Sequence, residues 1–186
     1  MNVLAVYGSN YGQAEAVVRR VAAVLEARGH TVDVVRGDAA ARSAVADHDA
    51  VVVAASIIVG RYQGYIRSFA KRHRAALSDR PTAFLSVSGA GPESSAAWRA
   101  EAERYVSAFV AETGWQPRWT ATFAGALRFR RYGLVTRWIM QRISRQKGGP
   151  TDTSQDYEFT DWDAVDRFGA MLAEGLAGGG GPATPA

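Results

Sequence analysis

The run Ala50–Ala55 places the tightest limit on the fold of this chain, because it contains only Ala and Val. A strand of this composition is expected to be buried on both faces, which is typical of the centre of a parallel sheet. Other apolar runs of strand length alternate with helical patterns along the chain. Strands that alternate with helices form right-handed crossovers and a parallel sheet, so the fold class is α/β.

Five strands fit the flavodoxin-like order 2-1-3-4-5, with helices on both faces of the sheet. They are expected at Val3–Tyr7, Thr31–Val35, Ala50–Ala55, Thr82–Val87 and Trp119–Phe123. Helices are expected at Gln13–Arg28, Tyr62–Leu77, Glu93–Thr113 and Asp161–Leu176, with room for a short one in Ala39–Ala46 and a sixth short strand at Asp156–Phe159.

The residues at two helix ends favour particular caps. Gly29 is expected to end the first helix at the C′ position, where glycine is common. Thr160 is expected to cap the last helix, with Asp163 three positions later as the acid of a capping box.

With 186 residues the chain is expected to form one domain, residues 1–176, with an insertion at about 127–155. Residues 177–186 are rich in Gly and are expected to form a disordered tail. The sequence has no Cys, which excludes disulfides and thiolate catalysis, and its three His residues are scattered, so no metal site is expected. No signal peptide is visible and the longest apolar run, Ala50–Gly60, is too short to cross a bilayer. We therefore expect a cytoplasmic protein, or one peripheral to the inner membrane face.

In sheets of this type ligands bind outside the carboxyl ends of the strands, at the switch point between the first and third strands. This rule selects three loops here, Gly8–Ala14, Ser56–Gly64 and Ser88–Pro92. The first loop opens a helix, and backbone N–H groups at a helix start bind phosphate. It lacks both the Lys-Ser/Thr of a P-loop and a G-x-G-x-x-G pattern, so a monophosphate is favoured; the alternative is a plain turn.

The second loop begins with apolar residues and the third has small ones, so together they could hold a planar ring. Tyr62 could stack on that ring or be the first core residue of the next helix. A phosphate at one loop and a ring between two others indicate flavin mononucleotide (FMN). The predicted cofactor residues are Ser9, Asn10, Tyr11, Gly12, Gln13, Ala14, Ser56, Ile57, Ile58, Val59, Gly60, Tyr62, Ser88, Gly89, Ala90 and Gly91.

The insertion is basic and partly apolar. Seven Arg and Lys residues and no acid lie between Leu127 and Pro150. Tyr132–Lys147 can be drawn as an amphipathic helix, which suits an anionic membrane surface. The alternative is a helix packed on its own domain with a solvated charged side. Nucleic-acid binding is not expected, because no nucleic-acid motif accompanies the charge.

Several motifs resemble those of the flavodoxin-domain, menaquinone-dependent protoporphyrinogen IX dehydrogenase family. They are Ala124–Tyr132, Gly148–Thr153, Tyr157 with Thr160-Asp-Trp162, Ala54–Ile57 and Gly60–Tyr62. The resemblance extends to about Leu172 and implies an FMN-dependent oxidoreductase of haem biosynthesis. Such a flavoprotein would take hydrogen from protoporphyrinogen IX and pass electrons to menaquinone or another membrane quinone.

Three features depart from the pattern of that family. Ala14 stands where a Thr is usual, Ile58 and Val59 replace an Arg and a Tyr, and Ser88–Ala97 is nearly uncharged. Within the insertion, Arg128 and Arg131 are the predicted substrate-binding residues, since Arg pairs with the propionates of a tetrapyrrole. No side chain stands out as a catalytic acid or base.

Two other functions remain open at this level. A flavodoxin-type electron carrier would usually present an acidic face, against which the basic insertion counts. The other is an FMN-dependent quinone reductase without a tetrapyrrole substrate.

Overall fold

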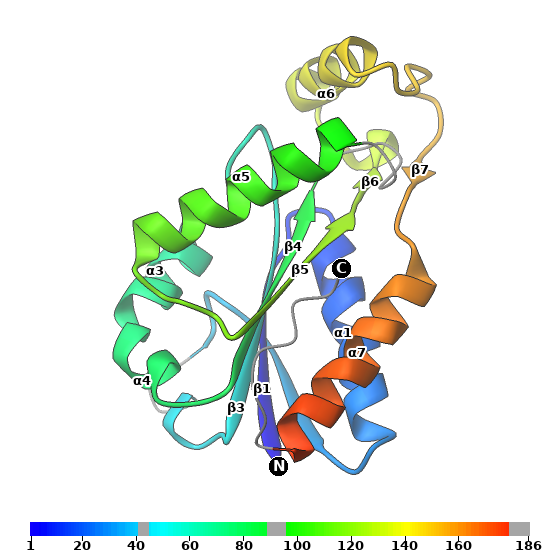
Figure 1. Ribbon diagram of the computed structural model, residues 1–186. Helices are drawn as coiled ribbons and strands as arrows, with labels where there is room; N and C mark the ends of the chain where they lie inside the picture. The colour runs from blue at the N-terminus through cyan, green and yellow to red at the C-terminus, as the bar shows by residue number, and fades with distance from the viewer. Residues whose placement is uncertain (41–44, 89–95, 179–186) are drawn as a thin grey trace.

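The computed structural model describes residues 1–40, 45–88 and 96–178. Its centre is a parallel sheet in the order β2-β1-β3-β4-β5, as the sequence predicts, with helices on both faces (Figure 1). The strands of this sheet are β1 (Asn2–Gly8), β2 (Thr31–Arg36), β3 (Ala50–Ser56), β4 (Thr82–Ser88) and β5 (Trp119–Ala124). The helices are α1 (Gln13–Glu26), α3 (Gly64–Arg72), α4 (Arg74–Ser78), α5 (Ala96–Thr113), α6 (Leu134–Gln146) and α7 (Trp162–Ala177).

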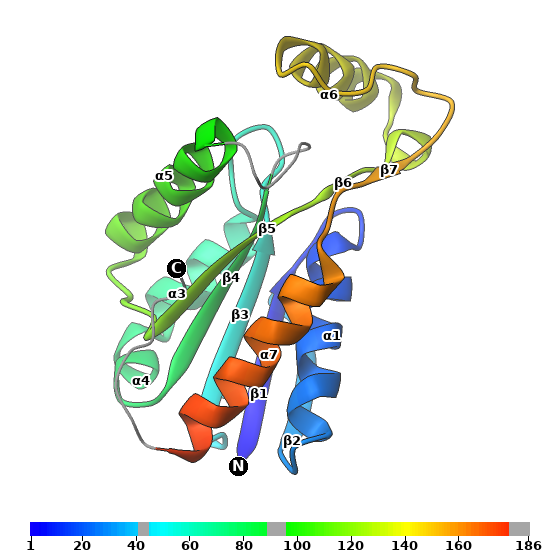
Figure 2. The same cartoon turned by 45° about the vertical axis from the view of Figure 1, so that its right-hand side comes forward.

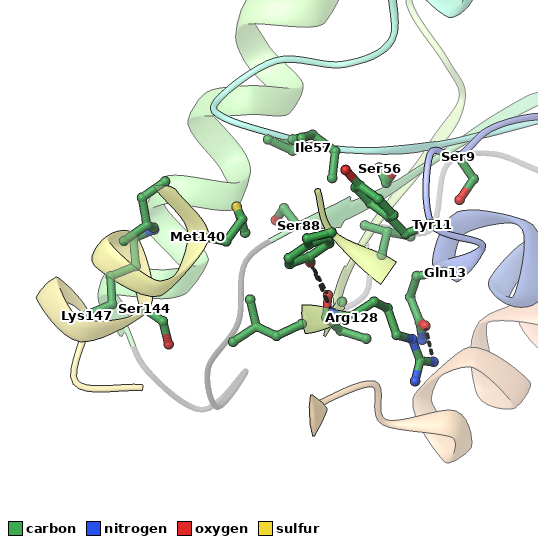
Figure 3. A pocket seen from close by; sticks show the side chains of 17 residues that line it. Ser9, Tyr11, Gln13, Ser56, Ile57, Ser88, Arg128, Met140, Ser144 and Lys147 are labelled. Atoms are coloured by element: carbon green, nitrogen blue, oxygen red, sulfur yellow. Dashed lines mark hydrogen bonds between the residues drawn. The ribbon is translucent and has the colours of Figure 1, made fainter. Parts of the chain in front are cut away.

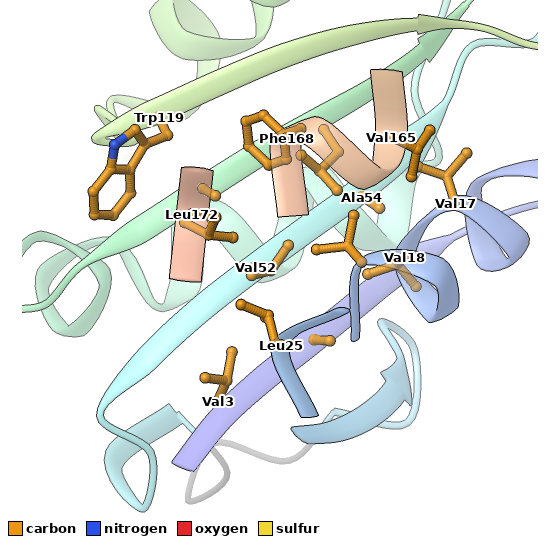
Figure 4. Close-up of a cluster of buried hydrophobic side chains, with 14 of the residues drawn as sticks. Val3, Val17, Val18, Leu25, Val52, Ala54, Trp119, Val165, Phe168 and Leu172 are labelled. Carbon is orange, nitrogen blue, oxygen red and sulfur yellow. The ribbon is translucent and has the colours of Figure 1, made fainter. Parts of the chain in front are cut away.

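Each face of the sheet is covered by its own group of helices. Helices α1 and α7 lie on one face and α3, α4 and α5 on the other (Figure 2). Alternate residues of one strand point to opposite faces, so Val52 packs against α1 and α7 while Val51 and Val53 pack in the cluster of α3, α4 and α5 (Figure 4). Every residue of β3 and β4 is buried, which confirms the expectation for the central strand.

Gly29 ends the first helix as predicted. Its φ of 84° lies in the left-handed region, where glycine carries no steric penalty. The N–H of Gly29 bonds to the carbonyl of Glu26 at 2.9 Å, and the N–H of His30 bonds to that of Leu25 at 3.2 Å. These two bonds form a Schellman motif, which turns the chain into β2.

Two predicted helix boundaries are wrong. The helix expected over 62–77 is divided at His73, whose φ and ψ of −99° and 12° leave the helical range. The last helix is capped by Asp161, which accepts the N–H of Ala164 at 2.9 Å. The predicted cap, Thr160, instead donates its hydroxyl to the carbonyl of Ala124 at 2.8 Å and ties the helix start to β5. Parts of the helices expected within 39–46 and 93–113, and most of the expected tail, lie outside the described residues.

The insertion leaves the carboxyl edge of the sheet as a two-stranded ribbon. Strands β6 (Ala126–Leu127) and β7 (Tyr157–Glu158) pair antiparallel, and between them lie the short helix η1 (Phe129–Arg131) and α6. The expected strand at 156–159 is therefore present. Helix α6 lies beyond the sheet at the far end of the ribbon (Figures 1 and 2). No helix in the described ranges is both long and apolar enough to span a bilayer.

Candidate functional site

A cavity lies at the carboxyl edge of the sheet, where the three predicted loops begin (Figure 3). It encloses about 650 Å³ of space, part of it open to solvent. One wall comes from the loops and the other from the insertion. The lining residues are Ser9, Tyr11, Gln13, Ser56, Ile57, Ile58, Val87, Ser88, Gly125, Ala126, Leu127, Arg128, Tyr132, Met140, Ile143, Ser144 and Lys147.

The first loop places the start of α1 beside this cavity. The Ser9 hydroxyl accepts the N–H of Gly12 at 2.9 Å, and Gly12 has a φ of 93°, so the loop needs glycine there. Gln13 begins α1, and its side chain is buried against the cavity wall. Ala14 is fully buried in the core between α1 and the sheet, so only its backbone can face a ligand.

The loop after β3 is tied to the first loop by Gln63, which the sequence analysis missed. Its Nε2 donates to the Ser56 hydroxyl at 2.9 Å and to Asn10 Oδ1 at 3.4 Å. Its Oε1 is buried and finds no donor among the described residues. The available sequence signal was a polar residue inside the second predicted loop, Ser56–Gly64.

Val59 and Gly60 form the tip of the same loop. Their φ values are 49° and 76°, and on either side Ile58 and Arg61 exchange backbone hydrogen bonds of 3.0 and 3.2 Å. A positive φ is unusual for a β-branched residue such as Val59 and indicates a strained backbone. The side chain of Val59 is half exposed, outside the cavity described above.

The structure corrects the expectation that Tyr62 could stack on a ring. Tyr62 is buried between Phe84 and Phe109, with ring centroids 5.4 and 5.2 Å away. Its hydroxyl shares a 2.8 Å hydrogen bond with Ser86, and burial raises its pKa. Of the two alternatives for Tyr62, the structure therefore shows the second, a residue of the core. In the third loop Ser88 lines the cavity, while Gly89, Ala90 and Gly91 lie outside the described residues.

Arg128 lies in a hydrogen-bond network that joins the ribbon to α1. Its Nη2 donates to Gln13 Oε1 at 2.9 Å (Figure 3). The same Nη2 donates to Glu158 Oε2, also at 2.9 Å. The Nε2 of Gln13 donates to the Thr160 hydroxyl at 2.8 Å, and the indole N–H of Trp162 donates to Glu158 at 2.8 Å. We call these five residues the polar clip. The Arg128 guanidinium already has partners within the polar clip. The expected contact of Arg128 with a substrate carboxylate therefore stays a prediction.

Arg131 has a different environment. It is exposed, its Nη1 lies 3.4 Å from the carbonyl of Tyr11, and it makes no ion pair within the described parts of the chain. Its guanidinium therefore lies beside the first loop, Gly8–Ala14, which is the candidate phosphate site, and no acidic side chain among the described residues pairs with it. Tyr132 lies deeper, edge-on to Tyr11 with centroids 4.5 Å apart, and burial raises the pKa of its phenol.

Helix α6 has two different faces. Met140, Ile143 and Lys147 point into the cavity region, and Lys147 forms an ion pair with Glu101 of α5. On the other side, three apolar side chains are 82%, 73% and 62% exposed. These are Leu134, Val135 and Trp138.

Arg137 takes no part in the exposed face of α6. It donates to the carbonyls of Phe129 and Tyr132 at 3.0 and 3.2 Å. A helix is present as predicted, but its apolar side chains lie on two faces, and neither the inward face nor this inward-pointing Arg could be assigned from the sequence.

Comparisons with known proteins agree with this geometry. A family model described as "Flavodoxin domain" matches residues 4–154. The Escherichia coli (strain K12) protein named protoporphyrinogen IX dehydrogenase [quinone] is 30% identical over 175 residues, which cover 93% of this chain and 95% of that protein. A Leishmania major protein of the same name is 31% identical over 159 residues, covering 86% of this chain and 67% of that protein. The chain belongs to this flavodoxin-domain dehydrogenase family.

Solved structures show the same fold. A flavodoxin from Pseudomonas aeruginosa has a TM-score of 0.58 at 16% identity, covering 96% of this chain and all of that chain. An archaeal flavodoxin has a TM-score of 0.55 at 15% identity, covering 95% of this chain and 99% of that one. The protein is therefore a flavodoxin-like oxidoreductase, and its fold implies a flavin cofactor.

We predict that Arg128→Ala will lower the free energy of unfolding by about 1–2 kcal/mol, because it removes hydrogen bonds of a largely buried charged group. Urea denaturation measures the loss, and hydrogen exchange at the β6 and β7 amides should show faster opening of the ribbon. Arg130→Ala is the matched control, since the Arg130 side chain is exposed. Equal stability of the two variants would show that the polar clip does not hold the ribbon.

Proposed function

We propose that the protein binds FMN in this cavity and oxidises protoporphyrinogen IX, or a related porphyrinogen, as a step in haem biosynthesis. Electrons then pass to a membrane quinone, menaquinone or another. The observation that carries the proposal is the second wall of the cavity. The insertion, which carries several of the motifs that resemble this dehydrogenase family, closes the flavodoxin-type loops into a cavity.

The residues present fit FMN. The start of α1 offers backbone N–H groups and the positive end of a helix dipole, which bind a phosphate. The hydroxyls of Ser56 and Ser88, which line the cavity, suit a polyhydroxyl chain. Ile57, Ile58 and Met140 provide apolar walls for a flat ring.

Bound FMN would supply the electron chemistry, accepting a hydride equivalent and releasing it to the quinone. The side chains of the cavity then have binding tasks. Leu127, Met140 and Ile143 exclude water from the ring site, and the polar clip holds the ribbon in place. Arg131 is proposed to contact a substrate carboxylate, because its charge is unmatched and it lies beside Tyr11, which lines the cavity.

We also propose that the outer face of α6 binds an anionic membrane at the cytoplasmic side. Leu134, Val135 and Trp138 are exposed together, and Arg142 and Arg145 are exposed on the same side of the helix. Exposed apolar residues flanked by Arg are typical of interfacial helices. A membrane contact here would bring the cavity close to a quinone dissolved in the bilayer.

The flavin phosphate gives the first test. FMN should bind at least about tenfold more tightly than riboflavin, because only FMN carries the group that the start of α1 would hold. Isothermal titration of the apoprotein with each flavin measures the difference. Equal affinities would overturn the phosphate site, and failure to bind either flavin would make the protein a non-flavin member of the fold.

The main function test uses anaerobic stopped-flow bleaching of the flavin band. Protoporphyrinogen IX should bleach the bound FMN, and a menaquinone analogue should restore its colour. With FMN saturating, Arg131→Ala should weaken bleaching by porphyrinogen, with Arg130→Ala as the control. Bleaching by NAD(P)H alone would indicate a quinone reductase. Slow bleaching by both, with fast exchange to a protein partner, would indicate an electron carrier.

The membrane proposal predicts co-sedimentation with phosphatidylglycerol vesicles that weakens as salt rises, since exposed charges are screened over about 8 Å at physiological ionic strength. Arg142→Glu with Arg145→Glu should weaken partition by roughly 30-fold or more, from about 1 kcal/mol for each lost basic residue. Arg28→Glu with Arg72→Glu makes the same charge change at the opposite end of the sheet and should have little effect. If both double variants pellet equally with vesicles, α6 is not the contact.

A further inference from the structure

A second chamber adjoins the cavity on the side away from the phosphate-loop candidate. It lies between the tip of the loop after β3, helix α5 and the inner face of α6, and encloses about 770 Å³, part of it open to solvent. Ile57, Ser88, Met140, Ile143 and Lys147 line both spaces. Two ligands could therefore lie on either side of one shared wall.

The described walls of this chamber are mainly apolar and aromatic. Its apolar and aromatic lining residues include Val59, Trp98, Tyr105, Met140 and Ile143. The indole N–H of Trp98 donates to the carbonyl of Ser88 at 3.1 Å, which fixes the ring against the end of β4. The strained tip holds the half-exposed Val59 at the rim. Such walls favour a flat, apolar ligand.

The charges of the chamber cancel. Among its described lining residues only Glu101 and Lys147 are charged, and they pair with each other. The Tyr105 hydroxyl also donates to Glu101, at 3.2 Å. Burial raises the pKa of the Glu101 carboxyl, but the contacts with Lys147 and Tyr105 outweigh it, and the pKa lies below its usual value. Glu101 is therefore a carboxylate at neutral pH, and the pair carries no net charge.

The first cavity differs in this respect. Arg128 lines it in a pair with Glu158. Arg131, which makes no ion pair among the described residues, lies beside Tyr11 of its lining. No Arg lies among the described lining residues of the second chamber. A ligand with carboxylates is therefore favoured on the Arg131 side of the first cavity. A neutral ring enters the second chamber at a lower desolvation cost than a charged ligand does. A charged group would lose its hydration there without gaining an ion-pair partner.

We propose that the second chamber binds the neutral quinone ring of the electron acceptor, so that acceptor and porphyrinogen occupy separate spaces. This assignment rests on the proposed function above. An ammonium has three N–H groups, so Lys147 can donate to a quinone carbonyl while it keeps its contact with Glu101. The outer face of α6, proposed above to touch the membrane, lies on the same helix as one wall of the chamber.

Gln146→Trp tests this assignment. Gln146 is exposed and lines only the second chamber, so a bulky ring there should fill the space without disturbing the core. In the FMN-loaded protein, the menadione concentration that half-saturates flavin reoxidation should rise by about tenfold or more, as should its dissociation constant from the oxidised protein by calorimetry. Bleaching by protoporphyrinogen IX should stay within about twofold. Arg28→Trp, an exposed position at the opposite end of the sheet, should change neither.

The outcomes separate this inference from the function on which it rests. Equal weakening of menadione and porphyrinogen would show one shared space, and weakening of porphyrinogen alone would reverse the assignment; each overturns the inference. So would unchanged menadione binding in the Gln146→Trp variant. If no porphyrinogen bleaches the flavin but the variant still loses menadione, the chamber assignment stands and the porphyrinogen function fails.

Discussion

The burial of β3 and β4 on both faces determines the rest of the molecule. Strands that carry only apolar and small side chains on both sides need a helical layer on each, and two layers require crossover connections that make all strands parallel. All carboxyl ends then meet at one edge. The loops that can hold a ligand are brought together by this requirement, although they come from distant parts of the sequence.

The insertion depends on interactions of another kind. Helix α6 is not part of either core layer, and its position follows from a small apolar cluster around Phe129 and from the polar clip. The hydrogen bonds of the polar clip fix the orientation of the ribbon more than they stabilise the fold. Each of them replaces a hydrogen bond that the same group would make with water in the unfolded chain. The same helix therefore can present one face to the ligand spaces and leave the opposite face exposed.

Sequence patterns predicted the fold well because burial and periodicity are local signals. The five strands, their order, the Gly29 cap and the helical insertion all follow from them. The predicted cap failed because of a single long-range contact: Thr160 bonds to Ala124 of β5, and Asp161 caps the helix instead. For the site, the rule of the switch point selected three loops whose described residues line the cavity. It could not show that Tyr62 points into the core, nor that the inner face of α6 completes the cavity.

The order of elements along the chain has a consequence for biosynthesis. Helix α7 covers one face of the sheet, with Phe168 and Leu172 in the core beside α1, yet it follows the insertion in sequence (Figure 4). A ribosome therefore completes α6 while only α1 can cover that face of the sheet. The exposed apolar face of α6 and the part of the sheet that α7 will cover coexist on the nascent chain, which is the interval when aggregation competes with folding. Helix α7 is the last of the described helices to be made and to pack on the sheet.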